Sequence, residues 1–490
     1  MRDEYVKVIK EYITQKIQLN HTLDQMKSQV IKAGATPEEF DQAVRQLTNN
    51  IFDTRTDVPI PPKIPKKSTF LKSKKFMLPF LFLVVIFISF IIANQINNSA
   101  TYSNQVTGIS NNSNQNQAHV NQGPIGQVYA NTQEVDPERA FSYPKSNIPL
   151  VVTNKPKKEI LGFFPYWMLS RADDINLDVL TSISIFGLET DGKGDIVTVN
   201  NKNNEIDGGW QMWKDPELDE FIKRAKSKGL KIFLTLKAFN SENIDNLVKS
   251  DESQKSFISN ALYLVSSKNL DGVNIDFEYV GSVTDESRQG FTRLITNLNA
   301  ELKRQFPNAS LTLDTYAISG SAPGLFELEQ LSPHVDAFVI MGYDLHTASS
   351  NPGPISPMGG NINLIGLSQG YLEKVDAQKL ILAVPYYGYD WPIASNPADS
   401  QGNASILPYS QIAEASAKQD LIWDDISQTP SYSYIDNGIT REVHFENVRS
   451  LGIKYDFINS KNLKGVGIWA LGYDGFNSDL QRLIVDKFAN

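Results

Sequence analysis

The sequence contains no cysteine, and only five of its 490 residues are histidines. The absence of cysteine excludes disulfides and thiolate metal sites, and it leaves no indication of a redox compartment. The histidines are scattered without metal-ligand spacing, so we predict no zinc or haem site and no cofactor. The net charge of −9 argues against nucleic acid as the main partner. The length predicts two or three folded units.

Charged residues are also missing between Lys75 and Glu134. The first part of this gap, residues 76–93, reads FMLPFLFLVVIFISFIIA and would span about 27 Å as a helix, close to the thickness of a bilayer core. Six lysines precede it: Lys63, Lys66, Lys67, Lys72, Lys74 and Lys75. By the positive-inside rule they place the N-terminus in the cytoplasm and the rest of the chain outside. We therefore predict a single-pass membrane anchor.

A cleaved signal peptide is the competing interpretation of this apolar run. It is less favoured because some 75 residues come first and no clear small-x-small cleavage site follows. Before the run, residues 1–57 are predicted to form a small cytosolic helical unit, with one apolar face at Val6, Ile9, Ile13 and Ile17. Residues 58–75 form a Pro/Lys-rich juxtamembrane segment, and residues 94–157 a flexible Asn/Gln/Ser-rich tether.

Residues 158–490 alternate apolar, strand-like runs with amphipathic helical stretches. Helices are predicted at Pro216–Ser227, Ser253–Ser267 and Arg288–Gln305. Eight strands are predicted at Glu159–Phe164, Ser182–Phe186, Lys231–Leu236, Gly272–Phe277, Ser310–Tyr316, Ala337–Met341, Lys379–Val384 and Gly465–Ala470. Eight such alternations indicate a parallel (β/α)8 TIM barrel.

The long interval between the seventh and eighth strands, about residues 392–460, leaves room for a small α+β insertion, with one strand at Glu442–Phe445. A doubly wound open sheet is the alternative architecture for residues 158–490. It is less favoured because no Gly-rich nucleotide loop follows the first strand.

The most informative run is Leu-Asp-Gly-Val-Asn-Ile-Asp-Phe-Glu at 270–278. Its apolar residues alternate with Asn274, Asp276 and Glu278, so a strand here carries two carboxylates on one face, about 7 Å apart. Burying such groups is costly unless they are paired or functional. The simpler alternative is an edge strand whose polar face meets water, but the flanking βα pattern argues against an edge.

Aromatic and acidic residues follow several other predicted strands. Tyr166 follows the first strand, Tyr343 and Asp344 the sixth, Trp391 the seventh, and Trp469 lies at the end of the eighth. In this fold catalytic groups lie at the carboxyl ends of the strands. Aromatic rings stack on sugar faces and carboxylates bind hydroxyls or protonate a glycosidic oxygen, so this pattern favours a carbohydrate site.

Together these motifs resemble glycoside hydrolase family 18, the chitinase-like barrels, over residues 158–490. The family signature Asp-Gly-x-x-x-Asp-x-Glu matches residues 271–278 and is accompanied by Met-Gly-Tyr-Asp at 341–344 and by Trp469. The runs at 236–240 and 386–391 are similar to the branch of bacterial spore and cell-wall glycan hydrolases. The resemblance implies a retaining mechanism in which the substrate supplies the nucleophile.

Carried over to this sequence, the resemblance assigns Glu278 as the general acid and Asp276 as the group that orients the 2-acetamido substituent. Tyr343 would hydrogen-bond the acetamido oxygen, Asp344 would contact the sugar, and Trp469 would form the floor beneath it. Two carboxylates on one strand face also push their pKa values apart, so that one can hold a proton near neutrality.

Further residues complete the predicted site. Asn274 departs from the family, in which many members have an aspartate; we expect its amide to hydrogen-bond Asp276. Asn274, Tyr166 and Trp391 are further candidates for substrate binding. Asp271 and Gly272 are assigned a structural part in the motif.

We therefore expect a membrane-anchored extracellular glycosidase that acts on β-linked N-acetylglucosamine-containing glycans, peptidoglycan before chitin. The alternative is a non-catalytic, lectin-like barrel, but relatives that only bind sugar commonly lack the acid that Glu278 provides. A third hypothesis is a signalling or scaffolding protein in which residues 1–57 bind an unknown cytosolic partner.

Overall fold

The computed structural model describes residues 134–141, 150, 152, 154–200, 204–322, 324–393 and 402–489, and four isolated residues near the N-terminus. The predicted membrane span at 76–93 lies outside these residues, as does nearly all of the predicted helical unit at 1–57. Among the described residues, no helix combines the length and the apolar character needed to cross a membrane. Contacts divide the chain into two units, and the fold described below belongs to the second, Ile17–His21 with Asn121–Asn490.

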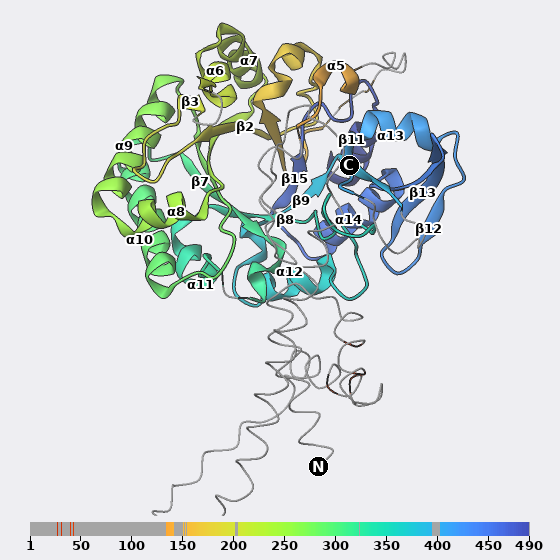
Figure 1. The fold of residues 1–490 in the computed structure, drawn as a ribbon. Helices are drawn as coiled ribbons and strands as arrows, with labels where there is room; N and C mark the ends of the chain where they lie inside the picture. The colour runs from red at the N-terminus through yellow and green to blue at the C-terminus, as the bar shows by residue number, and fades with distance from the viewer. Residues whose placement is uncertain are drawn as a thin grey trace, which may run out of the picture. The chain divides into compact units, whose positions relative to one another are not determined.

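Eight parallel strands close into a barrel, in the order β1-β15-β9-β8-β7-β6-β5-β2 (Figure 1). This confirms the predicted parallel barrel. All eight predicted strands are present, and β6, β7 and β8 have the predicted bounds. The strands are β1 Glu159–Pro165, β2 Ser182–Glu189, β5 Lys231–Ala238, β6 Gly272–Phe277, β7 Ser310–Tyr316, β8 Ala337–Met341, β9 Leu380–Pro385 and β15 Gly465–Trp469.

Helices surround the barrel, as Figure 1 shows for α7 to α10. Helix α7 has the predicted bounds, whereas α9 and α10 begin two and three residues earlier than predicted, because their N-cap side chains are Ser250 and Thr284. The helices are α5 Pro137–Ala140, α6 Gly208–Lys214, α7 Pro216–Ser227, α8 Ser241–Lys249, α9 Asp251–Ser267, α10 Asp285–Gln305, α11 Leu328–Leu331, α12 Leu364–Leu372, α13 Tyr409–Ser416, α14 Val448–Ser460 and α15 Asp479–Ile484.

Short 3-10 or π segments and a small hairpin complete the described part of the barrel. They are η1 Tyr166–Asp174, η2 Ala317–Gly320, η3 Ser332–His334, η4 Ala377–Lys379, η5 Val485–Ala489, β3 Val199–Asn200 and β4 Glu205–Ile206.

The insertion after the seventh barrel strand is a five-stranded antiparallel sheet, in the order β11-β10-β14-β13-β12, with helix α13. Its strands are β10 Tyr387–Pro392, β11 Ser405–Pro408, β12 Ile422–Asp424, β13 Thr429–Asp436 and β14 Ile439–His444. The sheet begins earlier than the predicted residue 392, because β10 follows β9 almost directly. It also ends before 460, since α14 packs against β15 and α15 of the barrel.

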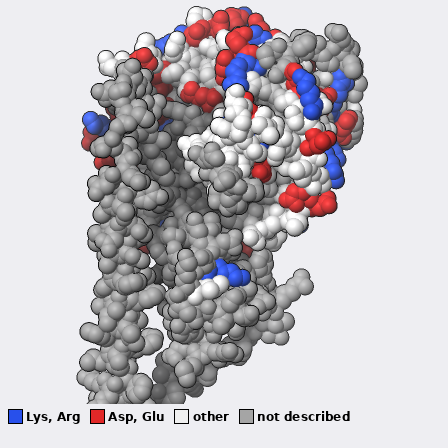
Figure 2. All heavy atoms as spheres, turned by 45° about the vertical axis from the view of Figure 1, so that its right-hand side comes forward, with Lys and Arg blue, Asp and Glu red and all other residues white. Residues whose placement is uncertain are grey.

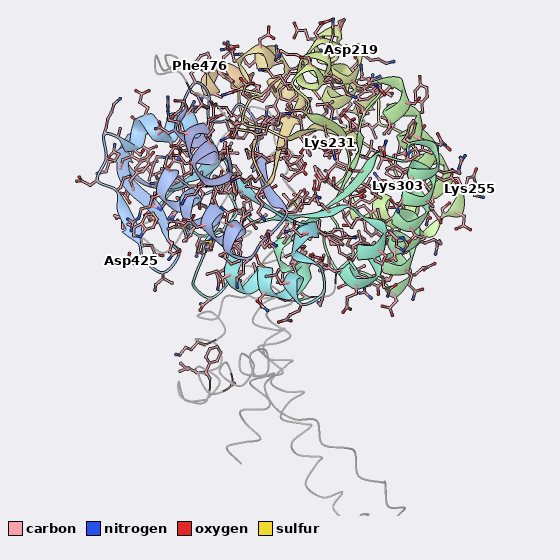
Figure 3. All side chains as sticks on the ribbon, turned by 180° about the vertical axis from the view of Figure 1, so that it is seen from behind. Asp219, Lys231, Lys255, Lys303, Asp425 and Phe476 are labelled. Atoms are coloured by element: carbon pink, nitrogen blue, oxygen red, sulfur yellow. The ribbon has the colours of Figure 1, made fainter. Side chains whose placement is uncertain are left out.

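Charged side chains mark the outside of this unit. Asp219, Lys255 and Asp425 extend outward from its rim (Figure 3). On the described part of the face in Figure 2, basic and acidic side chains lie interspersed around uncharged residues. A few carboxylates depart from this pattern, because they are buried at the carboxyl ends of the barrel strands: Asp276, Glu278, Asp314 and Asp344. Buried carboxylates are costly, so this end of the barrel is the candidate site.

Candidate active site

Strand β6 positions the two central carboxylates. Asp276 lies near its end and Glu278 directly follows it, and the two residues are only 4% and 2% exposed. At the other end of the strand, Gly272 allows a close approach, since a Cβ there would lie 2.0 Å from the Ser310 carbonyl oxygen. Asp271 accepts a hydrogen bond from the Ile232 backbone N–H at 2.9 Å. The beginning of the motif therefore fixes the strand, and its end carries the acids.

A cleft opens above these carboxylates, with about 510 Å³ of empty space when the open solvent at its mouth is included. Its walls combine aromatic rings with charged groups, the combination expected for a sugar site. The lining residues are Glu134, Phe163, Tyr166, Trp167, Phe186, Lys237, Phe239, Asp276, Glu278, Asp314, Met341, Tyr343 and Trp469.

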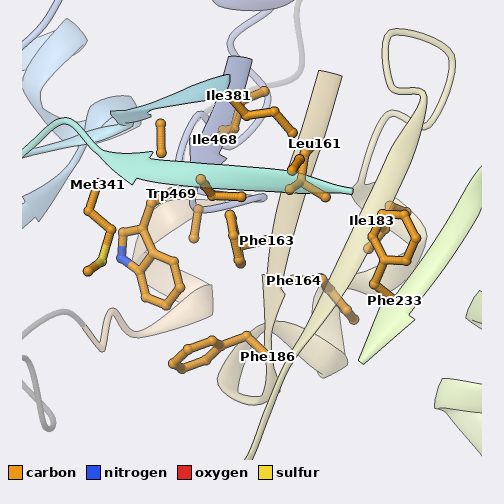
Figure 4. Packing of buried hydrophobic residues seen from close by; sticks show 14 of the residues in the cluster. Leu161, Phe163, Phe164, Ile183, Phe186, Phe233, Met341, Ile381, Ile468 and Trp469 are labelled. Carbon is orange, nitrogen blue, oxygen red and sulfur yellow. The ribbon is translucent and has the colours of Figure 1, made fainter. Parts of the chain in front are cut away.

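Trp469 is held in this cleft by other aromatic rings. Phe186 meets it edge-on with 4.6 Å between ring centroids, and Trp167 and Phe163 lie at 6.3 and 5.8 Å. Figure 4 shows Trp469 beside Phe163, Phe186 and Met341. Its Nε1 is buried without a hydrogen-bond partner among the described residues. The indole is thus fixed by packing, as a rigid surface in the cleft.

Asn274 lies beneath the carboxylates and is fully buried. Its Nδ2 donates to Asp314 Oδ2 at 2.7 Å and to Thr235 Oγ1 at 3.3 Å, and its Oδ1 accepts from Thr312 Oγ1 at 2.7 Å. The prediction of a hydrogen bond to Asp276 is therefore wrong for the described residues, because the amide bonds side chains of β5 and β7 on either side of it. Asn274 holds Asp314 in place rather than facing the cleft.

The buried carboxyl groups bind protons more tightly than exposed ones. Burial raises the pKa of Asp276 to about 7, although the positive charge of Lys237 lowers it. Burial also raises the pKa of Glu278 well above its ordinary value, and the negative charges of Asp276, Asp344 and Asp314 raise it further. Burial and Asp276 likewise raise the pKa of Asp314. Glu278 can therefore hold a proton at neutral pH.

Several carboxyl oxygens in the cleft have no hydrogen-bond partner among the described residues. One oxygen each of Asp276, Glu278 and Asp314 is buried without a hydrogen-bond partner among the described residues. Leaving such atoms unpaired costs free energy unless a ligand or water satisfies them. Tyr343, which follows β8, lines the same cleft, and burial raises its pKa, so it keeps its O–H as a donor.

The remaining predicted residues lie in different places. Tyr166 lines the cleft, where its hydroxyl donates to Glu134. Asp344 is 1% exposed and accepts a hydrogen bond from the Tyr387 hydroxyl, outside the cleft lining. Trp391 is not brought to the cleft. It is fully buried in the insertion, with Tyr389 and His444 at 5.4 and 5.8 Å between ring centroids.

Sequence reasoning missed Asp314 and Lys237. Both lie on the polar face of a barrel strand, with Thr312 preceding Asp314 by two residues and Thr235 preceding Lys237 by two. The period-two pattern that identified Asp276 was therefore also present in β5 and β7. It is weaker there, because neither strand carries a pair of carboxylates on that face.

A closed parallel barrel with buried acids and aromatic rings at its carboxyl end defines the class of barrel glycoside hydrolases. Residues 159–474 match the family model of glycosyl hydrolases family 18. The chain belongs to this family and is a glycoside hydrolase.

Several relatives carry names related to spores. The Bacillus subtilis protein named as a sporulation-specific glycosylase, YdhD, is 26% identical over 362 residues, covering 71% of this chain and 79% of that protein. The cortical fragment-lytic enzyme of Bacillus anthracis is 26% identical over 258 residues, covering 51% of this chain and 57% of the enzyme.

Solved structures share the fold. The Bacillus cereus spore cortex-lytic enzyme SleL matches with a TM-score of 0.56 at 21% identity, covering 69% of this chain and 75% of that one. The Ostrinia furnacalis Group IV chitinase, solved with allosamidin, matches with a TM-score of 0.57 at 20% identity, covering 67% of this chain and 98% of that one.

Proposed function

We propose that the protein hydrolyses β-linked N-acetylglucosamine-containing glycans, of the peptidoglycan or chitin type, by a retaining, substrate-assisted mechanism. One observation carries the proposal: Asp276 and Glu278 are buried two residues apart beneath a cleft that Tyr343 and Trp469 also line. The fixed indole of Trp469 suits the apolar face of a pyranose ring. The unpaired carboxyl oxygens suit its polar substituents.

In the first step, protonated Glu278 gives its proton to the glycosidic oxygen. The bond from that oxygen to C1 breaks, and its electron pair leaves with the oxygen. The carbonyl oxygen of the 2-acetamido group on the same sugar forms a new bond to C1, giving an oxazolinium ion. Asp276 accepts a hydrogen bond from the acetamido N–H and stabilises the developing positive charge. Tyr343 donates a hydrogen bond to the acetamido oxygen.

In the second step, the Glu278 carboxylate takes a proton from water, and the water oxygen bonds to C1 from the face that the leaving group left. The oxazolinium ring opens, the acetamido group is restored and Glu278 is protonated again. Two inversions at C1 give overall retention. The raised pKa of Glu278 supports the first step, because the group must hold a proton at rest. It supports the second step as well, because a carboxylate with a raised pKa accepts a proton from water more readily.

We propose peptidoglycan as the preferred glycan because the relatives named above include a cortical fragment-lytic enzyme and a spore cortex-lytic enzyme. The test is to incubate the full-length protein with purified wall glycan and with chitin oligosaccharides. We expect new reducing ends, identified by mass spectrometry, and proton NMR of the first product should show the β-anomer. An α-anomer as first product, or saturable binding with no new reducing ends, would contradict the proposal.

We also propose that residues 76–93 anchor the enzyme in the cell membrane, with residues 1–75 in the cytoplasm and the barrel outside. The support is the uncharged run and the six lysines before it. We expect the full-length protein to stay in the membrane pellet after alkaline carbonate washing, and protease added to intact cells to degrade the barrel. Release by carbonate, or protection of the barrel in intact cells, would contradict this topology.

A further inference from the structure

Lys237 provides the one positive charge among the described residues that line the cleft. It lies on β5, in register with Glu189 of β2 on one side and with Asp276 of β6 on the other. The carboxyl groups of Glu134, Asp276, Glu278 and Asp314 line the same cleft. The proposed hydrolysis involves no direct contact with this lysine, although burying an ammonium group is costly.

The contacts of Lys237 leave its hydrogen-bond donors available. Its Nζ forms a long ion pair with Glu189 Oε2 at 3.9 Å, which is beyond hydrogen-bond distance, and the side chain is 9% exposed. Within the described part of the chain, Nζ makes no hydrogen bond and no ion pair with Asp276 or Glu278 within 4 Å. The rings of Phe186 and Phe239 lie 5.6 and 5.1 Å from Nζ and stabilise the charge.

The electrostatics around Lys237 permit an anion to approach. Burial raises the pKa values of Glu278 and Asp314, so both groups tend to hold protons and to carry less negative charge at neutral pH. The wall formed by β5 then presents an ammonium group beside Phe186, the ring on which Trp469 packs. A cation in this position lies next to the surface proposed to carry the sugar.

We propose that Lys237 binds a carboxylate carried by the glycan, and so selects an acidic polysaccharide over uncharged chitin. The inference rests on the proposed function and narrows its substrate class. In peptidoglycan freed of its stem peptides the carboxylate belongs to the lactyl ether of N-acetylmuramic acid, and a uronic acid offers the same chemistry. A charge-assisted hydrogen bond in a partly dry cleft gives such a group discrimination of about 10- to 100-fold.

The test compares one glycan in two forms. Peptide-free wall glycan is used with its carboxylates intact and with the same groups reduced to alcohols, and the full-length protein is assayed on both. We expect the ratio of kcat/KM values, intact over reduced, to fall about 10- to 100-fold in Lys237→Met and to be largely kept in Lys237→Arg. Any effect of the lysine on the catalytic acids acts on both forms and cancels in the ratio.

Lys231→Met is the matched control, because Lys231 is exposed at the opposite end of the same strand. Its ratio should equal that of the wild type. Hyaluronan oligosaccharides, which pair N-acetylglucosamine with a uronic acid, form a second arm of the assay. A kcat/KM that depends on Lys237, for wall glycan or for hyaluronan, supports the proposal and identifies the source of the carboxylate. A ratio unchanged within twofold in Lys237→Met, with no dependence for hyaluronan, overturns it.

Binding distinguishes failure of this inference from failure of the proposed hydrolysis. Calorimetry with the same two forms of wall glycan requires no turnover. We expect the full-length protein to bind the intact form about 10- to 100-fold more tightly, and Lys237→Met to lose that difference. If no glycan is cleaved but this difference is present, the hydrolase proposal fails and the carboxylate site stands. Equal affinities for both forms overturn the site.

Discussion

Replacing Glu278 by glutamine is expected to lower kcat about 100- to 10,000-fold, the range over which a general acid contributes. Glutamine keeps the size and the buried position of the side chain but has no proton to give to the glycosidic oxygen. The measurement is the release of reducing ends from wall glycan by the full-length protein. The wild-type rate should also fall at high pH as Glu278 loses its proton, and the variant should lack this limb.

Glu220→Gln is a suitable control for this substitution. It makes the same chemical change on a side chain that is 76% exposed. We expect its activity to equal that of the wild type. Activity of Glu278→Gln within tenfold of the control would show that another group donates the proton, and it would remove the central step of the proposed mechanism.

Replacing Asp276 by asparagine is expected to lower kcat about 100- to 1,000-fold, the usual loss when one group that stabilises transition-state charge is removed. The amide can still hydrogen-bond the acetamido group but cannot balance the positive charge of the oxazolinium ion. Initial rates on a chromogenic chitin oligosaccharide measure this effect. Because the loss concerns the transition state, kcat should fall while KM changes little.

The same substitution should stabilise the protein at neutral and alkaline pH. Asp276 holds its proton up to a pKa of about 7 in the folded protein, against 3.8 for an ordinary aspartate. Between these values the unfolded chain binds fewer protons than the folded one, so rising pH favours unfolding. Removing the group should raise the free energy of unfolding at pH 8 by roughly 2–4 kcal/mol and change little at pH 4.

Urea unfolding of the full-length protein at the two pH values checks this expectation. Asp425→Asn, the same change on an exposed residue of the insertion (Figure 3), should be neutral at both. A variant that is inactive but no more stable at pH 8 would mean that burial of the charged Asp276 carboxylate does not destabilise the fold. A variant that is more stable and fully active would instead remove its proposed part in catalysis.

Much of the fold could be predicted because barrel strands are local patterns. The run at 310–316 alternates apolar and polar residues, and the run at 337–341 is continuously apolar, and both became strands with the predicted bounds. Helix starts were placed less well, since an N-cap such as Thr284 acts through one side chain and leaves no period in the sequence. The insertion was located, but its first strand was hidden by direct continuation from β9.

In the candidate site too, some residues could be identified from their local spacing and others could not. Asp276 and Glu278 were found together because two residues on one strand share a face whatever surrounds them. Trp391, in contrast, follows a barrel strand in sequence but turns into the insertion, where His444 of β14 covers it. Asn274 was expected beside Asp276, and it binds Asp314 of the neighbouring strand instead.

Residue spacing along the chain was enough to predict the barrel, the pair of acids on β6 and the family signature, because each depends on residues that lie close together in the chain. Which side chains share the cleft depends instead on how the strands pair. Lys237 and Asp314 reach it from β5 and β7, on either side of β6, and Trp469 reaches it from β15. Closure of the sheet brings these distant residues together, and burial there raises the pKa values on which the proposed chemistry depends.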